Sequence, residues 1–416
     1  MLTVRIWILL FSAIQQAVTY DGPFAVVIKR KMCPSLEGVE GTCEGHEAVV
    51  VSAAVKYLQT QGHAMAAQLL TKAVRTKDPY PQYLGAGKFG APRQAFGEAV
   101  ANILGQMQSA EERRERVLVV DSDLEGSCGL KKIRESWPEV YINSGVMERA
   151  NFSACAGFGF ASKERQGIFG TFAAFQEMIV SEITMARLNF CNVLCHFSHS
   201  GVDDMADNMC HFGQNNFFAD NGLAEESCPK TELFFPADVH QMTQVIERIF
   251  CEPGLRFVYS TRSKVPELLD KDGTPVYAGD RKFELGCDDV ISGAGMPCNG
   301  YIVSYGDALY RSLDAVRRLH QEGIVVGLVN KCHLNCVDEE VMQLIGKSSF
   351  VVVVESQNTK TGLGIRFGTL LLERGLSPKF ARCGTHADGC GGMWEHAYHQ
   401  GYDPESIMSV VRKLMA

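Results

Sequence analysis

The chain has 416 residues, of which 46% are hydrophobic and 21% charged, and its formal net charge at pH 7 is −8. This composition is typical of a soluble globular protein, and the length is sufficient for two or three domains, each with its own core. The acidic balance excludes a generally basic surface, so we expect no nucleic-acid partner. An anionic ligand would have to be held by a few local Arg, Ser and His side chains.

An apolar stretch near the N-terminus allows two interpretations. Arg5 precedes the apolar run Ile6–Phe11 and small residues follow it, which resembles a secretory signal. The alternative is a buried helix over Ile8–Val18 that leads into a strand over Phe24–Ile28. The stretch is too short to span a bilayer, so we expect no membrane partner. A glycosylation sequon at Asn151 falls on a predicted buried helix, where a glycan would be hard to accommodate. We therefore favour a cytoplasmic protein, with secretion as the alternative.

The 15 cysteines are odd in number and scattered, which indicates reduced thiols buried as small hydrophobic side chains. Two tighter groups contain the residues Cys332, His333 and Cys336, then Cys383, His386 and Cys390. Together they could form a zinc site. Neither group has a Cys-x-x-Cys pair, however, and the first follows an apolar run at a predicted strand end. We expect no metal ligands among them.

The first 84 residues predict a strand at 24–28 and helices at 48–58 and 64–74. The stretch Lys77–Pro92 carries three prolines and three glycines and marks a domain boundary.

Beyond this boundary, short apolar runs alternate with helical stretches in two successive regions. The first region predicts helices at 94–107, 148–161, 172–188 and 239–249, and strands at 117–120, 140–142, 193–197 and 257–260. The second predicts strands at 301–304, 324–329 and 350–354, and helices at 309–320, 339–344 and 404–414. Such alternation implies mostly parallel sheets covered on both faces. We therefore predict an α/β protein with two doubly wound domains, at 85–263 and 300–416, joined by a linker at 264–299.

Two glycines, Gly362 and Gly364, follow the predicted strand at 350–354. A third glycine is out of register for a dinucleotide-binding loop, and no acidic residue follows at the required distance. We expect an ordinary turn into a helix there.

The most specific segment of the sequence is Asn143–Phe152, which places Glu148 at the start of an apolar helix directly after a strand. A carboxylate in that position usually does no more than interact with the helix dipole. Here it is accompanied by three further segments, namely Val120–Ser127, Ile168–Phe175 and Ser198–His211.

The order of these segments resembles the pyrimidine-binding domain of the transketolase family over roughly Gly85 to Arg262, and the region after Tyr301 resembles the C-terminal domain of that family. The resemblance implies a thiamine-diphosphate-binding fold and a transferase that moves a two-carbon ketol unit between sugars or sugar phosphates. A homodimer, or a complex with a chain that holds the diphosphate, is the implied assembly. Two alternatives stay open: a β-type subunit of a 2-oxoacid dehydrogenase or decarboxylase, and a non-catalytic scaffold or truncated pseudoenzyme.

The resemblance also implies roles for individual residues. Glu148 matches the catalytic glutamate that hydrogen-bonds the aminopyrimidine ring, beside which Phe172 and Phe175 match the aromatic positions. The matches to residues that touch sugar hydroxyls are His199, Asp207 and His211. The matches to residues that line the substrate channel are Arg93, Asp123, Ser127 and Arg262, of which the arginines and the serine hold a sugar phosphate. A final match is His46, which resembles the histidine that closes the diphosphate domain.

A carboxyl group that is hydrogen-bonded to a pyrimidine ring promotes the imino tautomer of the cofactor, which then activates the thiazolium carbon. An apolar surrounding makes this shift easier, and histidines on a polar loop can position hydroxyls and transfer protons near neutral pH.

The sequence departs from the family pattern in ways that bear on substrate and assembly. Met147-Glu148-Arg149 stands where the family usually has Arg-Glu-His, so the substrate is not fixed by the resemblance. The family binds diphosphate and Mg²⁺ through a Gly-Asp-Gly segment, and none occurs here. We expect the Mg²⁺ ligands on a partner chain or a missing domain. Residues 1–84 then represent a remnant of the diphosphate domain and a helical linker, which favours a truncated product over a natural split.

Overall fold

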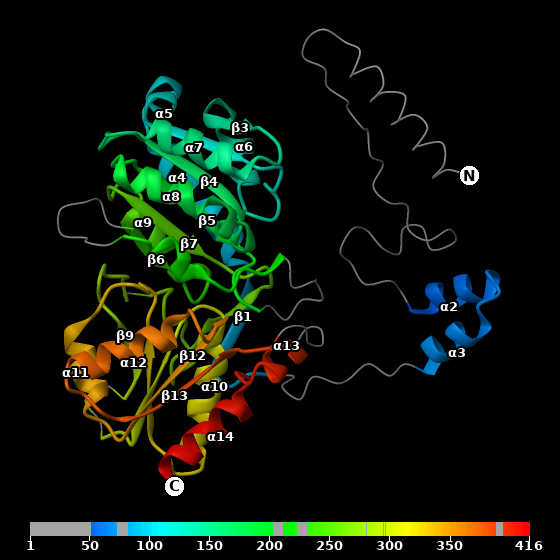
Figure 1. Ribbon diagram of the computed structural model, residues 1–416, viewed down its shortest axis with the longest axis vertical. Helices are drawn as coiled ribbons and strands as arrows, with labels where there is room; N and C mark the ends of the chain where they lie inside the picture. The colour runs from blue at the N-terminus through cyan, green and yellow to red at the C-terminus, as the bar shows by residue number, and fades with distance from the viewer. Residues whose placement is uncertain are drawn as a thin grey trace. The chain divides into compact units, whose positions relative to one another are not determined.

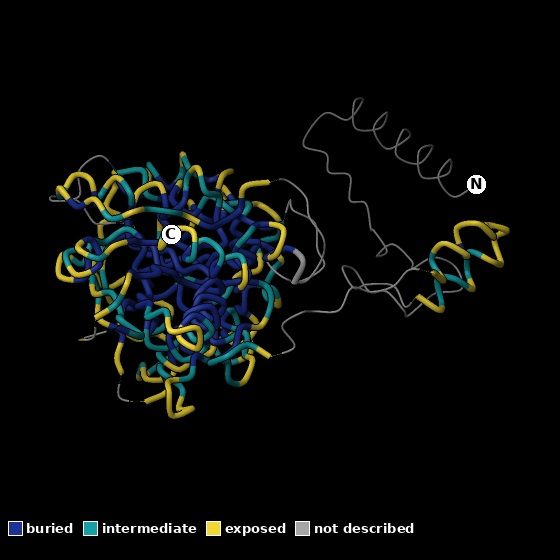
Figure 2. The backbone as a smooth tube through the Cα atoms, turned by 90° about the horizontal axis from the view of Figure 1, so that it is seen from below, coloured by how far each residue is buried: buried dark blue, intermediate teal, exposed yellow. Residues whose placement is uncertain are grey.

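The computed structural model describes residues 51–72, 82–202, 211–222, 231–279, 281–293, 295, 297–387 and 394–416. The predictions for His46, Asp207, Cys390, the N-terminal apolar stretch and the strand at 24–28 concern positions outside these residues. The chain divides into two compact units, Met1–Lys77 and Asp78–Ala416. In the first unit the described part consists of helices α2 (Val51–Thr60) and α3 (Ala64–Lys72), which confirms helices near both predicted places. Their surfaces are mostly exposed or half-buried (Figure 2).

The second unit begins its core with a fully parallel six-stranded sheet in the order β3-β2-β4-β5-β7-β6. The strands are β2 (Val117–Asp121), β3 (Tyr141–Asn143), β4 (Gln166–Phe172), β5 (Val193–Ser198), β6 (Thr231–Phe234) and β7 (Leu255–Tyr259). Its helices are α4 (Pro92–Gly105), α5 (Ala110–Arg116), α6 (Lys131–Ser136), α7 (Glu148–Phe158), α8 (Val180–Leu188) and α9 (Val239–Ile249), coloured cyan to green in Figure 1.

Both faces of this sheet are covered, and its strands β4, β5, β6 and β7 are buried at every position. In β5, Leu194 packs into the cluster formed with α4, α6 and α9. Its neighbours Val193 and Cys195 pack into the opposite cluster, with α7 and the start of α8. This alternation is the period of two expected for a strand. The predicted doubly wound α/β architecture is confirmed.

A second sheet has the order β13-β12-β10-β11-β9, with β9 antiparallel and the other strands parallel. The strands are β9 (Asp289–Ser292), β10 (Gly300–Ser304), β11 (Val326–Asn330), β12 (Phe350–Asn358) and β13 (Lys379–Thr385). Its helices are α10 (Ala308–Gln321), α11 (Glu339–Gly346), α12 (Leu363–Glu373), α13 (Trp394–His399) and α14 (Pro404–Met415), coloured yellow to red in Figure 1. A short antiparallel pair connects the start of the second unit with the predicted linker. It consists of β1 (Ala86–Gly90) and β8 (Val265–Leu268).

The two sheets share one hydrophobic cluster. The ring of Phe235, which follows β6, lies 5.7 Å between centroids from the ring of Tyr305, which follows β10, and the two planes are tilted by 53°. The backbone N–H of Phe235 also donates to the carbonyl of Cys332 at 2.9 Å. Buried apolar side chains from α7 and from α12 belong to the same cluster. The second α/β region therefore packs directly on the first.

The predicted helix at 172–188 is wrong in its first half. The chain forms strand β4 up to Phe172, then a 3-10 helix over Ala173–Ile179, and only then α8. Two glycines interrupt the apolar pattern of β4, so the sequence does not predict this strand. Gly167 is required there, since a Cβ at this position would lie 2.4 Å from the Cβ and the carbonyl oxygen of Cys155 in α7. Strands β1, β4, β6, β8, β9 and β13 were not predicted.

Strand β12 also extends beyond its predicted end at Val354, to Asn358. The last four residues of β12 are polar, yet Glu355, Ser356 and Gln357 are fully buried. The predicted turn into a helix after Gly362 is confirmed by α12. Within the described residues, no helix is both long and apolar enough to cross a bilayer.

Candidate active site

The carboxyl ends of the parallel strands in the first sheet gather most of the predicted site residues. Asp121 ends β2, Phe172 ends β4 and pairs in register with Ser198 at the end of β5. Glu148 begins α7, the helix that follows β3. Ligands of open α/β sheets bind at this edge. The fold therefore brings Glu148, Phe172 and His199 to the edge where a site is expected.

Glu148 is buried, with 6% of its surface exposed, although it is the first residue of a helix. The preceding loop is fixed by Asn151, whose side-chain nitrogen donates to Ser122 Oγ at 2.9 Å and to the carbonyl of Gly145 at 3.0 Å. The hydroxyl of Ser144 in turn donates to the side-chain oxygen of Asn151. These bonds tie the start of α7, where Glu148 lies, to the end of β2.

An aromatic wall lies at the end of β4. The Phe172 ring is 3.9 Å from the His199 ring, 5.6 Å from the Phe175 ring and 5.6 Å from the His211 ring, measured between centroids. His199 has a φ of 58°, in the left-handed region, and its Nδ1 lies 2.9 Å from Ser198 Oγ. The structure therefore brings together four predicted residues, two assigned to the cofactor and two to the sugar.

Burial lowers the pKa of His199 from 6.5 to about 2, and the positive charges of Arg262 and Arg93 act in the same direction. The imidazole of His199 is therefore neutral at pH 7 in this state. A neutral imidazole can accept and donate hydrogen bonds but is a poor source of protons. This favours a role for His199 in orienting a hydroxyl group.

The predicted phosphate-binding residues lie on two loops and one helix start. Arg93, in the first turn of α4, donates from Nη1 to the carbonyl of Arg262, which follows β7. Gly129 ends the loop after β2, and a Cβ there would lie 1.7 Å from the carbonyl oxygen of Arg93. The half-buried Ser127 lies on this loop, as does the exposed Asp123, which has a φ of 64°. Arg93 thus contacts both the Arg262 segment and the loop of Ser127.

The sequence did not single out several buried polar groups behind this edge. His196 is fully buried, with Nδ1 2.8 Å from the carbonyl of Cys128, Nε2 2.9 Å from Ser260 Oγ and its ring stacked on Phe96 at 4.4 Å. Cys128 Sγ lies 3.3 Å from Ser198 Oγ. A histidine inside an apolar strand run gives no sequence signal for such a network, because its partners are distant in the chain.

His196 makes the stability of the protein depend on pH. Burial lowers the pKa of His196 from 6.5 to about 4. The unfolded chain therefore binds a proton that the folded chain does not, and this stability is lost as the pH falls below about 6.5. Between pH 7 and pH 5 we expect wild type to lose about 2 kcal/mol more than His196→Gln, measured by urea unfolding. An equal loss in both proteins would contradict this role of His196.

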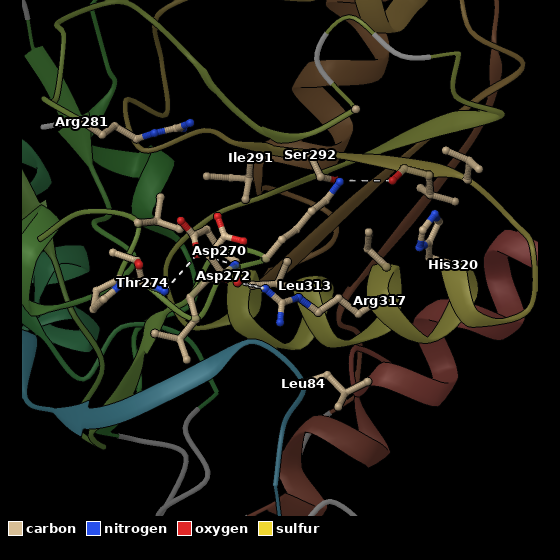
Figure 3. A pocket seen from close by; sticks show the side chains of 18 of the residues that line it. Leu84, Asp270, Asp272, Thr274, Arg281, Ile291, Ser292, Leu313, Arg317 and His320 are labelled. Carbon is tan, nitrogen blue, oxygen red and sulfur yellow. Dashed lines mark hydrogen bonds between the residues drawn. The ribbon is translucent and has the colours of Figure 1, made fainter. Parts of the chain in front are cut away.

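A cavity of about 920 Å³ lies away from this edge, beside α10 (Figure 3). Leu84, Leu313 and Ile291 contribute to its apolar part, and Arg317 and His320 to its polar part. Arg317 Nη2 donates to the carbonyls of Leu269 at 2.6 Å and Asp270 at 2.8 Å, so it is engaged with the linker. None of the predicted site residues lines this cavity.

The described residues contain no group of three or more His, Cys, Asp or Glu side chains that could hold a metal ion. Cys332 and Cys383 are buried in hydrophobic clusters, and burial raises the pKa of both thiols. Cys390 lies outside the described part of the chain.

Comparisons with known proteins match both α/β regions. Residues 92–266 match the family model "Transketolase, pyrimidine binding domain", and residues 300–388 match "Transketolase, C-terminal domain". A "Putative transketolase C-terminal section" of Methanocaldococcus jannaschii is 24% identical over 339 residues, which cover 79% of this chain and 98% of that protein. The transketolase of Rattus norvegicus is 23% identical over 289 residues, and these cover 69% of this chain but only 43% of the rat protein.

Among solved structures, one titled "Split gene transketolase, inactive beta4 tetramer" matches with a TM-score of 0.62 at 21% identity. The match covers 78% of this chain and 98% of that chain. This similarity supports the fold of both α/β regions.

Proposed function

This chain belongs to the transketolase family, and we propose that it carries the pyrimidine half of a thiamine-diphosphate site for transfer of a two-carbon ketol unit between sugars. The observation that carries this proposal is the buried Glu148 at the start of α7, on the same sheet edge as the Phe172 and His199 rings. The match covers 43% of the rat relative, and we propose that the complete reaction requires further protein.

The residues present fit the aminopyrimidine part of this cofactor. Phe172 and Phe175 form a stacked apolar pair whose planes differ by 26°, and such a surface suits a flat heteroaromatic ring. Glu148 supplies one buried carboxyl group that can hydrogen-bond a ring nitrogen. When bound, thiamine diphosphate supplies the nucleophilic carbon that carries the two-carbon unit.

The protein groups then have separate tasks. We propose that Glu148 holds and moves a proton at its carboxyl group, since the residue is largely shielded from water and a positioned carboxyl group can act as a general acid or base. His199 and His211 orient sugar hydroxyls. Asp207, which lies outside the described residues, belongs to the same proposed set, as do Asp123 and Ser127 along the substrate channel. Arg93 and Arg262 bind a phosphate group, since guanidinium groups match phosphate oxygens in charge and geometry.

The diphosphate half is proposed to come from a partner chain or a preceding domain, which would carry the Mg²⁺ ligands and a counterpart of His46. Three observations support a partner. The relative with nearly the same extent is named as a C-terminal section, and the similar solved structure is named an inactive tetramer of one chain type. In addition, α7, α8 and their flanking loops expose the large apolar side chains Met147, Phe160, Met178, Met185, Leu188 and Phe190. An apolar surface of this kind marks an interaction site.

The proposal is tested by ketol transfer from a ketose to an aldose, measured for this chain mixed with a diphosphate-domain chain of a split relative. Transfer by the mixture, and by neither chain alone, is the expected result. A stable complex with cofactor bound and no transfer would contradict the proposal and favour a scaffold.

Substrate charge gives a more specific prediction. Arg262→Ala should raise the KM for a phosphorylated sugar by about 10- to 100-fold, because the lost contact is a charge-assisted hydrogen bond. The KM for the matching unphosphorylated sugar should change little. Lys264→Ala is the control, since Lys264 is an exposed cation two residues away. Equal increases for both sugars would make Arg262 structural.

A further inference from the structure

The end of β12, in the second sheet, lies against the loop that carries His199 and His211. The backbone N–H of Val202 donates to the carbonyl of Ser356 at 3.1 Å, and that of Asn358 donates to the carbonyl of Gln214 at 3.0 Å. A Cβ at Gly201 would lie 2.1 Å from Ser356 Oγ, so the Gly201 backbone lies closer to the Ser356 side chain than any other residue would allow. The loop has two described limbs, residues 199–202 and residues 211–216. Both limbs therefore contact the end of β12 in the second sheet.

One buried side chain connects the two limbs. Gln357, with 0% of its surface exposed, has its amide between them. The amide is satisfied in the orientation that turns its oxygen toward donors and its nitrogen toward acceptors. In that orientation the oxygen accepts from the Gly201 N–H at 2.9 Å and lies 3.2 Å from Ser200 Oγ. Its nitrogen donates to the carbonyl of Gln214 at 3.1 Å and to Asn216 Oδ1 at 3.1 Å. All hydrogen-bonding capacity of this amide is thus directed at the two limbs.

The limbs are also bonded to each other around His199. The Gly213 N–H donates to the carbonyl of His199 at 2.9 Å. The Gly201 N–H is shared between the Gln357 oxygen and the carbonyl of Gly213, which lies at 2.6 Å. His199 itself has a φ of 58°. A residue other than glycine keeps this conformation only where its surroundings hold it. The groups that hold it include the Gln357 amide, which comes from a strand more than 150 positions along the chain.

We infer that Gln357 is a positioning residue that sets the place of the His199 imidazole against the Phe172 ring. Gln357 contacts the loop backbone and the side chains of Ser200 and Asn216, and it acts through them. The inference rests on the proposed function only in so far as His199 serves there. Its physical content, the coupling of β12 to His199, can be measured without a partner or a cofactor.

The first measurement is NMR of the full chain labelled in histidine. A ring centroid 3.9 Å away should displace the His199 imidazole resonances through the aromatic ring current, and His199→Asn identifies them by their loss. In Gln357→Met, which has a similar size but no hydrogen bonds, this displacement should be lost. In Gln357→Asn, which keeps the amide on a shorter side chain, it should be reduced. If Gln357→Met does not fold, Gln357→Asn decides the outcome.

Gln400 provides a matched control. It is a buried amide whose bonds all stay within the second α/β region, to the N–H groups of His386 and Ala387 and to the carbonyl of Ala387. Gln400→Met and Gln400→Asn remove the same groups at a comparable depth, and they should leave the His199 resonances in place. Unmoved His199 resonances in a folded Gln357 variant, or equal shifts in the Gln400 variants, would overturn the inference.

The second measurement is kinetic and uses the reconstituted complex. Gln357→Asn should raise the KM for the sugar by about tenfold, the effect of one misplaced hydrogen-bonding group, with a smaller change in kcat. Gln400→Asn should change neither constant. A fall in kcat with an unchanged KM would contradict a positioning role toward the sugar. If the complex shows no transfer at all, the proposed function fails while the resonance shifts still decide the coupling.

Discussion

Glu148→Gln is expected to slow exchange of the thiazolium C2 proton of bound thiamine diphosphate by about 10²- to 10⁴-fold in the reconstituted complex. Glutamine has the same shape, so the fold and the aromatic wall should persist. An amide cannot take up and return a proton as a carboxyl group does. Water cannot easily replace the carboxyl group, because only 6% of the Glu148 surface is exposed. Deuterium exchange of the cofactor, quenched with acid and read by NMR, measures this rate.

Glu182→Gln is the control for this experiment. Glu182 lies in α8, beside α7, and its carboxylate pairs with the exposed Arg149 at 2.7 Å. The change removes an acidic group next to the same helix but away from the sheet edge that carries the site. The rate of C2 proton exchange should therefore stay within about twofold of the wild-type rate. Exchange at the wild-type rate in Glu148→Gln, with cofactor bound, would remove Glu148 from its proposed role.

The isolated chain is expected to bind thiamine diphosphate and Mg²⁺ weakly or not at all. Burial of one ring against Phe172 and Phe175 supplies about 1.5–3 kcal/mol, whereas loss of translational and rotational freedom costs about 4–15 kcal/mol. Most of the cofactor's charge is on the diphosphate, which is ordinarily held through Mg²⁺ with oxygen ligands. Calorimetry should therefore give no measurable heat of binding at micromolar concentrations.

Addition of a diphosphate-domain chain should restore Mg²⁺-dependent binding at the interface between the chains. The chain alone should also self-associate through the exposed side chains around α7 and α8. Tight Mg²⁺-dependent binding by the 416-residue chain without a partner would refute the half-site and require the metal ligands to lie within this chain.

The elements that could be predicted from sequence are those with a strong local signal. Helix α9 begins and ends at the predicted residues because Asp238 caps it through the Gln241 N–H and its apolar residues recur on one face. Strand β4 could not be recognised in the same way, because Gly167 is required by the close contact with helix α7 and breaks the apolar pattern of the strand. Tertiary contact overrides local preference at such positions.

The same distinction applies to the candidate site. Glu148, Phe172 and His199 could be proposed because a family motif places them in one order along the chain. Gln357 could not, since polar residues after an apolar strand read as the start of a loop. Its partners, Gly201 and Gln214, lie in another part of the sequence. No local pattern contains that information.

Gly167 sets the distance between strand β4 and helix α7, because it has no side chain. The bare backbone of β4 lets α7 pack directly on the sheet, because a Cβ at Gly167 would lie 2.4 Å from the Cβ and the carbonyl oxygen of Cys155 in that helix. A side chain at this position would displace α7, a helix of eleven residues that begins at Glu148. In a screen of all single substitutions, a position with no chemistry of its own would then register among the residues that perform it.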